Sequence, residues 1–188
     1  MKMEEIYNDL PTIETPRLRL RKLTLGDAEN MFSYCSNEEV AKYVTWDRHE
    51  TIDHTIDFIM FVLEQYQSQK IAPWAIEVKE TNEMVGTIDF VSWSIHHNHA
   101  EIGYALSQQY WGKGMIPEAA TALLTFGFEN MNLERIEARC FVENTASAKV
   151  MEKIGMTREG TMKKKMFTKG KFWDVHCYAI LREQFYRL

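Results

Sequence analysis

Residues 109–114 (QYWGKG) place one lysine between two glycines, directly before a stretch with helical apolar spacing. Glycine at these positions lets the backbone turn sharply and come close to a ligand. Backbone N–H groups and the positive end of the helix dipole then point at one place, where an anion can bind. The pattern Gln109-x-x-Gly112-x-Gly114 therefore predicts a seat for a pyrophosphate that needs no metal ion. The alternative is an ordinary tight turn between a strand and a helix.

Two other phosphate-binding motifs do not fit this loop. A Walker A loop needs Ser or Thr after Gly-Lys to hold magnesium, but Gly114 follows Lys113. A dinucleotide fingerprint needs a third glycine three residues after Gly114, where Pro117 stands. The histidines of segment 96–99 are expected in a solvated turn, because neighbouring turn positions cannot easily converge on one ion. The sequence thus predicts no metal cofactor.

The segments on either side of the loop position it. Residues 100–107 are predicted as a strand, and Pro117 fits the first turn of the helix that follows the loop. One apolar stripe runs along this helix, formed by Ala120, Leu123, Leu124, Gly127, Phe128 and Met131. Residues 135–142 follow as another strand. The unit is a crossover, so its two strands are expected to be parallel.

The remaining pattern predicts an α/β fold. In segment 17–23, leucines alternate with arginines, which indicates a strand with one face in water. Further strands are predicted at 73–79, at 83–95 and on both sides of the Lys169-Gly170 turn, and helices at 50–70, at 144–155 and as a pair broken near Ser36-Asn37. Together they predict a central mixed, mostly antiparallel sheet with helices on both faces. We expect a single domain over residues 1–188, with its core at about 15–183.

Composition limits the function. A net charge of −5 and a pI near 5.7 argue against nucleic-acid binding, which normally needs a basic surface. No apolar run approaches the roughly 18 residues of a membrane span, and the start shows no signal-peptide pattern. The three cysteines, Cys35, Cys140 and Cys177, have no CxxC spacing, which is typical of thiols in a reducing compartment. We therefore expect a cytoplasmic protein without membrane or nucleic-acid partners. The oligomeric state stays open.

Gln-x-x-Gly-x-Gly after EIGYAL resembles the acyl-CoA loop of the GNAT superfamily of N-acetyltransferases. The resemblance extends over nearly the whole chain. ETPRLRLRKL is similar to the family's first strand, AEIGYALSQQYWGKGMIPEA to its fourth strand and loop, and RIEARCFVENTASAKVMEKIGM to its fifth strand and following helix. The combination of Ala-Glu-Ile-Gly-Tyr with Asn-x-x-Ser most resembles the Rim-type branch, which acetylates alanine or serine N-termini of ribosomal proteins.

This resemblance implies that acetyl-CoA is the co-substrate and lies in a gap between splayed fourth and fifth strands. The backbone N–H near Leu106 would polarise the acetyl carbonyl, and amides from Trp111 to Met115 would hold the pyrophosphate. Asn144 would contact CoA near the pantetheine as well as capping its helix. The residues expected to contact the cofactor are Leu106, Gln109, Trp111, Gly112, Lys113, Gly114, Met115 and Asn144.

Two further residues match catalytic positions of that branch. An amine is mostly protonated at neutral pH, so acyl transfer to it needs a proton acceptor. The resemblance gives this role to Glu101, acting through a water, and gives Ser147 the role of protonating the departing CoA thiolate. The structural alternatives are a solvated strand-end carboxylate and a first-turn helix serine. Tyr104 and Tyr178 are rival acids.

The predicted activity is direct attack of a primary amine on acetyl-CoA, with a protein N-terminal α-amine as the acceptor. A small amine (a polyamine, amino acid or antibiotic) is the alternative acceptor, and a CoA-binding regulatory module without turnover is the alternative class. Tyr43, Trp46 and Asp47 are expected either to wall the acceptor groove or, for the aromatic residues, to join the core. The basic hairpin 162–172 could be an interface, a neighbour of the CoA 3′-phosphate or a solvated ribbon.

Overall fold

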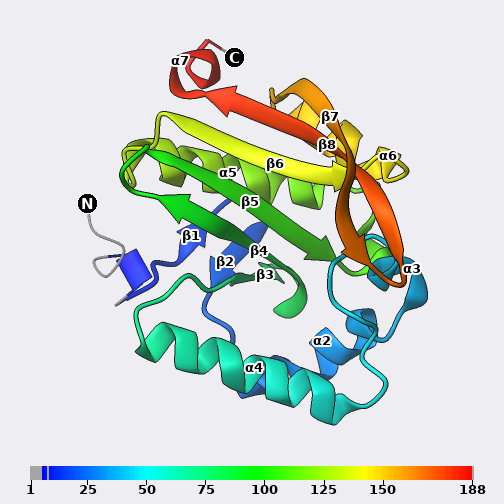
Figure 1. The fold of residues 1–188 in the computed structure, drawn as a ribbon. Helices are drawn as coiled ribbons and strands as arrows, with labels where there is room; N and C mark the ends of the chain where they lie inside the picture. Colours follow the sequence, from blue (N-terminus) through cyan, green and yellow to red (C-terminus); the bar gives the residue numbers. More distant parts are fainter. Residues whose placement is uncertain (1–5, 8, 188) are drawn as a thin grey trace.

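The chain folds around one mixed sheet (Figure 1). The computed structural model describes residues 6–7 and 9–187. Within them, eight strands lie in the order β1-β2-β3-β4-β5-β6-β8-β7. They are β1 (Ile13–Glu14), β2 (Leu18–Arg21), β3 (Trp74–Val78), β4 (Glu83–Ser94), β5 (His99–Leu106), β6 (Arg135–Phe141), β7 (Thr157–Thr168) and β8 (Lys171–Leu181). Each neighbouring pair is antiparallel except β5 and β6, which are parallel as the crossover predicts.

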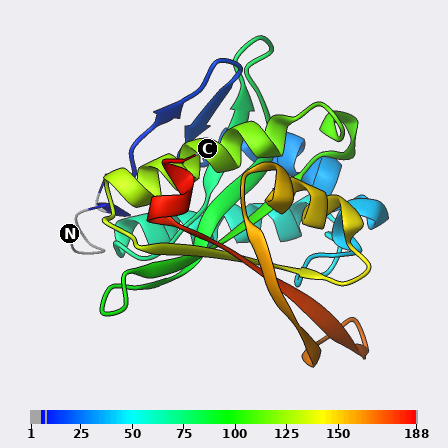
Figure 2. The same cartoon turned by 90° about the horizontal axis from the view of Figure 1, so that it is seen from above.

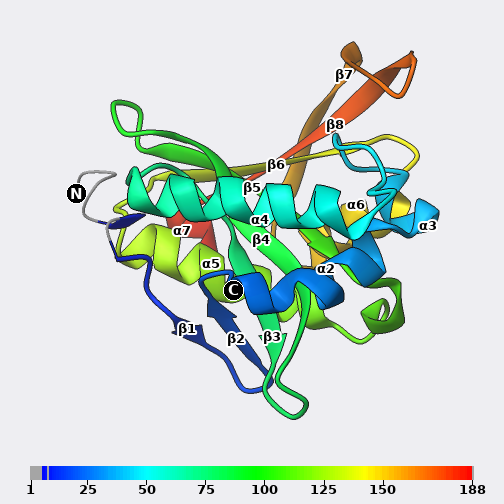
Figure 3. The same cartoon turned by 90° about the horizontal axis from the view of Figure 1, so that it is seen from below.

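Helices cover both faces of this sheet (Figures 1 and 3). They are α2 (Ala28–Cys35), α3 (Glu38–Ala41), α4 (Ile52–Gln67), α5 (Met115–Glu129), α6 (Thr145–Lys153) and α7 (Arg182–Phe185), with short 3-10 helices η1 (Leu25–Asp27) and η2 (Gln108–Tyr110). Helices α2 and α4 lie on one face, and α5 and α6 lie on the other. The predicted α/β architecture is therefore confirmed.

Helix α5 and the central strands form the core that supports the glycine loop. The whole apolar stripe predicted for this helix is buried. Trp74 of β3 is fully buried, and its ring lies 6.3 Å from Phe90 of β4 and 5.9 Å from Phe126 of α5, measured between centroids. Burying a side chain of this size contributes about 2–3 kcal/mol to folding. The loop before α5 is therefore connected directly to a well-packed part of the core.

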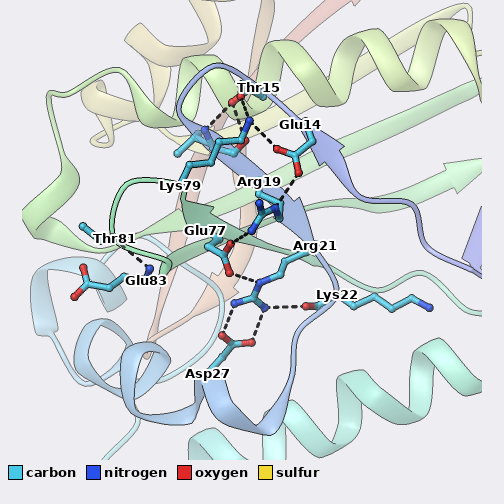
Figure 4. A network of polar contacts seen from close by, with 11 residues as sticks. Glu14, Thr15, Arg19, Arg21, Lys22, Asp27, Glu77, Lys79, Thr81 and Glu83 are labelled. Atoms are coloured by element: carbon cyan, nitrogen blue, oxygen red, sulfur yellow. Dashed lines mark hydrogen bonds and ion pairs between the residues drawn. The ribbon is translucent and has the colours of Figure 1, made fainter.

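The alternation of the strand predicts that the arginines of β2 face water, but two of them form ion pairs with buried carboxylates instead. Arg21 makes a bidentate ion pair with Asp27, at 2.9 Å from Nη1 to Oδ2 and 2.7 Å from Nη2 to Oδ1, and its Nε donates to Glu77 at 2.6 Å. Arg19 Nη1 donates to the other oxygen of Glu77 at 2.6 Å. Both carboxylates are buried. This network, shown in Figure 4, ties β2 to β3 and to the start of α2.

Local signals set several element boundaries where the sequence predicts them. Asn37 begins α3 because its side chain accepts from the N–H of Glu39 at 2.9 Å, directly after α2 has ended. The turn between β7 and β8 has positive φ values at Lys169 and Gly170. The resulting hairpin extends away from the body of the molecule (Figure 2). In the part of the chain that the structure describes, no helix has both the length and the apolar character of a membrane span.

Candidate active site

Strands β5 and β6 separate beyond the middle of the sheet (Figure 1). Their parallel pairing ends at Ile102 and Ala138, whereas β5 continues to Leu106 and β6 continues to Phe141. Residues 103–105 are half-exposed although β5 is a central strand. The splayed strands expected from the sequence are therefore present, and the space between them beyond this pairing is called the gap below.

The glycine loop at the end of β5 has the backbone geometry that its sequence predicts. Gly112 and Gly114 have φ values of +73° and +75°, in the left-handed region that favours glycine. Gly114 is the N-cap residue of α5, and no side chain caps the N–H groups of the first turn. These amides, at the positive end of a helix of 15 residues, remain available for an anion.

Arg17 and Glu118 anchor this loop to the strand next to it. Arg17 Nε donates to Glu118 Oε2 at 2.6 Å, and Arg17 Nη1 donates to the backbone oxygen of Lys113 at 3.0 Å. Glu118 lies in the first turn of α5, where an unpaired carboxylate would repel an anion. Its pairing with Arg17 removes that repulsion. The sequence analysis missed this pair because the two residues are 101 positions apart.

Most of the residues predicted to contact the cofactor lie in the segment from the end of β5 to the start of α5, whereas Asn144 lies at the start of α6. Gln109, Trp111 and Lys113 are exposed, whereas the side chain of Met115 is buried, so Met115 can reach a ligand only through its backbone. Trp111 Nε1 donates to the backbone oxygen of Leu106 at 2.9 Å, which fixes the indole across the end of β5.

The N–H of Leu106 faces the gap. The next residue, Ser107, donates its N–H to the backbone oxygen of Val85 on β4 at 2.7 Å. Because neighbouring backbone groups alternate in direction along a strand, the N–H of Leu106 points away from β4 and toward the side of β6. This is the orientation that the expected contact with an acyl carbonyl requires.

On the α6 side of the gap, two hydroxyl groups meet. Tyr104 Oη lies 2.8 Å from Ser147 Oγ, and the N–H of Ser147 donates to Asn144 Oδ1 at 3.1 Å. Asn144 thus caps α6, as the structural alternative for this residue predicts. Burial raises the pKa of Tyr104, so its hydroxyl keeps its proton. Tyr178, the other rival acid, donates instead to Glu152 at 3.2 Å.

On the opposite face, Glu101 is held by an arginine. Glu101 is 9% exposed, and Arg139 Nε donates to its Oε1 at 2.7 Å while Arg139 Nη2 donates to Oε2. The carboxylate is therefore neither a freely solvated strand-end group nor unpartnered. Arg139 lies on β6, beyond the last residue that pairs with β5. The ion pair thus bridges the two strands where they begin to separate, and sequence reasoning did not identify it.

The sequence between residues 17 and 157 matches the acetyltransferase (GNAT) domain family. The chain belongs to the GNAT acetyltransferase family. It is 35% identical over 172 residues to the uncharacterized N-acetyltransferase YoaA of Bacillus subtilis, an alignment that covers 92% of this chain and 97% of that protein. The predicted resemblance is confirmed, and the protein is an acetyl-CoA-dependent N-acetyltransferase.

Solved structures of GNAT proteins share this fold. The crystal structure of a GNAT family acetyltransferase from Bacillus anthracis has a TM-score of 0.83 and 36% identity, and the match covers 92% of this chain and 99% of that chain. The ribosomal L7/L12 α-N-protein acetyltransferase RimL, in complex with coenzyme A, has a TM-score of 0.80 and 23% identity, covering 91% and 98%. At this level of identity, the similarity to RimL shows a shared fold and no shared substrate.

A charged groove of about 550 Å³ lies at the rim of the Glu101 face of this GNAT fold. It runs between α3, the segment after α3 and the β7–β8 hairpin. Three acidic side chains, four basic side chains and one tryptophan line it: Glu38, Glu39, Asp47, Lys42, Arg48, Lys169, Lys171 and Trp173. The groove is open to the surface.

Aromatic residues join the hairpin to the segment after α3. The ring of Trp173 stacks on Phe141 at 4.5 Å and meets Tyr43 edge-on at 6.2 Å, measured between centroids. Lys169 Nζ donates to the backbone oxygen of Trp46 at 2.9 Å. Tyr43 therefore packs against Trp173 of the hairpin, Trp46 packs against the main core, and Asp47 lines the charged groove. The tip of the basic hairpin lies on this face as well.

Within residues 6–7 and 9–187, no three His, Cys, Asp or Glu side chains gather as they would around a metal ion. His96 and His97 are exposed in the β4–β5 turn, and His99 begins β5.

Proposed function

We propose that this GNAT enzyme transfers the acetyl group of acetyl-CoA to the α-amine of a protein N-terminus, of the ribosomal-protein type. One observation carries the proposal. The gap between β5 and β6 has Glu101 on one face and the Tyr104–Ser147 pair on the other. An amine and a thioester can therefore approach each other through the sheet, with a carboxylate beside the amine and hydroxyl donors beside the sulfur.

The cofactor would lie on the α5 side of the sheet. The first-turn amides of α5 and the backbone of residues 111–115 would hold the pyrophosphate, and the pantetheine arm would pair with the free edge of β5 near Leu106. A groove of about 570 Å³ runs along α5 from Pro117 and Glu118 to Lys153 at the end of α6, and it offers space for the nucleotide end of CoA. The left-handed conformation of Gly112 and Gly114 and the absence of a side-chain cap at Gly114 support this placement of the pyrophosphate.

The acceptor groove favours a peptide over a small amine. Sites for small molecules are usually enclosed and mostly apolar, because they must bury most of the ligand. The groove between α3 and the β7–β8 hairpin is open, and charged side chains of both signs line it. Such a surface suits the polar backbone and mixed side chains that follow an N-terminal residue. Trp173 lines this groove, and its buried ring stacks on Phe141, the last residue of β6.

The chemistry is a direct transfer. The neutral amine nitrogen would attack the acetyl carbonyl carbon, the carbon–sulfur bond would break, and the thiolate would take a proton from the Tyr104–Ser147 side. Glu101 would stand beside the incoming ammonium. The N–H of Leu106 would donate to the carbonyl oxygen, where negative charge develops. Placement of the two substrates in one gap supplies a large part of such a rate enhancement.

Release of CoA thiol, measured against a panel of amines, tests the acceptor. We expect peptides that begin with Ala or Ser to give a kcat/KM at least tenfold above that of polyamines and free amino acids. The matched control is the same peptide with a blocked N-terminus and a free internal lysine, which should give little release. Preference for the small amines would contradict the peptide proposal. CoA binding without release for any amine would indicate a regulatory module.

A pair of variants tests the acceptor groove separately. Trp173→Ala should raise KM for the peptide several-fold and leave KM for acetyl-CoA unchanged. Phe172→Ala is the matched control, because this neighbouring ring is exposed and packs on Phe167 in the hairpin. Equal effects of the two variants on peptide KM would argue against the groove.

A further inference from the structure

A second carboxylate, Asp89, lies beside Glu101 on the acceptor face. Asp89 on β4 pairs with Gly103, which is the first residue of β5 beyond the end of the β5–β6 pairing. A Cβ atom added at Gly103 would lie 3.4 Å from Asp89 Oδ1. The carboxylate therefore lies over the strand at the point where the gap opens. Both Asp89 and Gly103 are largely but not fully buried, so the carboxylate keeps a small exposed fraction at this place.

Asp89 and Glu101 differ in their partners. Both oxygens of Glu101 accept hydrogen bonds from Arg139. The guanidinium of Arg139 therefore occupies both carboxylate oxygens, and this bidentate contact fixes the direction in which Glu101 points. Among the residues that the structure describes, Asp89 forms no hydrogen bond and no ion pair with another side chain. Both oxygens of Asp89 are therefore free to accept a proton from a ligand.

The groups around Asp89 carry negative charge or none. Glu101 faces it from β5, and the hydroxyls of Tyr7 and Tyr66 interact with it from the segment before β1 and from α4. Tyr34 of α2 is engaged with Thr87, two residues away on β4. Burial, and secondly the charge of Glu101, raise the pKa of Asp89 to about 7. A group with such a pKa exchanges protons efficiently near neutral pH.

The Tyr7 hydroxyl adds a second sign of a polar space near Asp89. Tyr7 is fully buried, and its hydroxyl has no hydrogen-bond partner among the described residues. Buried hydroxyl groups normally have a partner, which is often a water molecule. A water held between Tyr7 and Asp89 would give the carboxylate a route for passing a proton onward.

We propose that Asp89 accepts the proton that the acceptor ammonium must lose, and that Glu101, held by Arg139, orients that ammonium by its charge. One N–H bond of the ammonium breaks, and its proton goes to a carboxylate oxygen of Asp89. The freed lone pair then attacks the acetyl carbonyl carbon. The second proton leaves the nitrogen as the carbon–sulfur bond breaks, and in net terms it balances the protonation of the thiolate. The inference rests on acetyl transfer to an amine and on no particular acceptor.

The pH dependence of Asp89→Asn tests this assignment. We expect kcat/KM for an Ala-starting peptide to fall on the order of 10²-fold at pH 7.5. In the wild type, kcat/KM should rise with pH up to about the pKa of Asp89, and this acidic limb of the pH profile should be absent from Asp89→Asn. Asp57→Asn, on the exposed face of α4, is the matched control and should behave as the wild type. In Glu101→Gln the acidic limb should remain but move to lower pH, because a negative charge beside Asp89 is removed.

A fluorinated acceptor separates proton transfer from a structural effect. A peptide that begins with trifluoroalanine has a more acidic ammonium, so its amine is already neutral in the assay and needs no proton acceptor. The deficit of Asp89→Asn should shrink at least tenfold with this peptide, whereas a misfolded site would lose both activities equally. Three results would overturn the proposal. The pH profile of Asp89→Asn could keep the acidic limb of the wild type, or the acidic limb could disappear in Glu101→Gln but not in Asp89→Asn. Alternatively, Asp89→Asn could lose the same factor in kcat/KM with both peptides. If the wild-type enzyme turned over neither peptide, the result would count against the proposed peptide acceptor and not against Asp89. The wild type and Asp89→Asn would then be compared with an amine that the wild type accepts.

Discussion

Tyr104 Oη lies 2.8 Å from Ser147 Oγ, and this contact joins β5, at the gap, to the first turn of α6. A serine hydroxyl alone is a poor acid, so its neighbour decides what the pair can do. Burial raises the pKa of Tyr104, which keeps the phenol protonated and able to donate. Asn144 fixes the serine backbone through its cap. The two hydroxyls therefore form one unit on the side where the thiolate would leave.

Removing the phenol should slow the transfer without weakening cofactor binding. We expect Tyr104→Phe to lower kcat about 10²-fold, with KM for acetyl-CoA changed less than threefold, in steady-state measurements of thiol release. Because the hydroxyls act together, Tyr104→Phe combined with Ser147→Ala should cost little more than the larger single effect. Tyr178→Phe is the control, since that hydroxyl donates to Glu152. Fully additive losses would show two independent roles.

The backbone geometry of the loop and of the helix starts could be predicted from the sequence because its parts are local. The glycine loop, the start of α5 and the cap at Asn144 each depend on residues a few positions apart, and turn and cap chemistry specifies them. The crossover also follows from order alone, and with it the parallel β5–β6 pair.

The acceptor side could not be predicted in this way. Glu101 and Arg139 are 38 positions apart, and only the register of β5 and β6 brings them together. Asp89 appears in an ordinary alternating strand, and its proximity to Gly103 depends on pairing across the sheet. Two-residue β1 is too short to give a periodic signal, and it forms because β2 supplies its hydrogen bonds. Such contacts depend on tertiary structure, which propensity does not describe.

Arg17 should control affinity for the phosphates of the cofactor. We expect Arg17→Ala to raise KM for acetyl-CoA about tenfold, a loss of about 1.4 kcal/mol, because the carbonyl of Lys113 loses its donor and the carboxylate of Glu118 loses the positive charge that balances it. S-acetylpantetheine lacks the pyrophosphate, so its KM should stay unchanged. Arg17→Ala with Glu118→Gln should recover part of the affinity, because the unpaired charge is gone. A tenfold rise with S-acetylpantetheine as well would point to a general disturbance of the fold.

Gly112 should tolerate no side chain because of its backbone conformation, not because of crowding. Among the described residues other than its two chain neighbours, none has an atom within 4 Å of a Cβ added there, yet the φ of Gly112 is +73°. The left-handed conformation costs an L-residue roughly 1–2 kcal/mol. Gly112→Ala should therefore raise the Kd for CoA about 5- to 30-fold in calorimetry, while Gly170→Ala, at the similar φ of +72° in the β7–β8 turn, should leave it unchanged. Equal affinity of Gly112→Ala and the wild type would show that the loop adapts.

The Arg21–Asp27 pair should make stability depend on acid pH. Burial opposes the charge of Asp27, but hydrogen bonds from Arg21 and Thr24 outweigh it and lower the pKa of this carboxyl below its usual value. A lowered folded-state pKa contributes stability that is complete above the unfolded value of about 3.9 and is lost as pH falls through the folded value. Breaking this buried pair by Asp27→Asn should cost about 3 kcal/mol, or about 10 °C in Tm for a domain of this size.

The difference in Tm between the wild type and Asp27→Asn, followed by circular dichroism, should be constant from pH 7 to about 5 and should narrow below pH 4. Glu38→Gln, which removes an exposed partner of Arg48, should change Tm by less than about 2 °C at every pH. A Tm difference that stays the same down to pH 3 would show that packing, and not the charge of Asp27, supplies the stability.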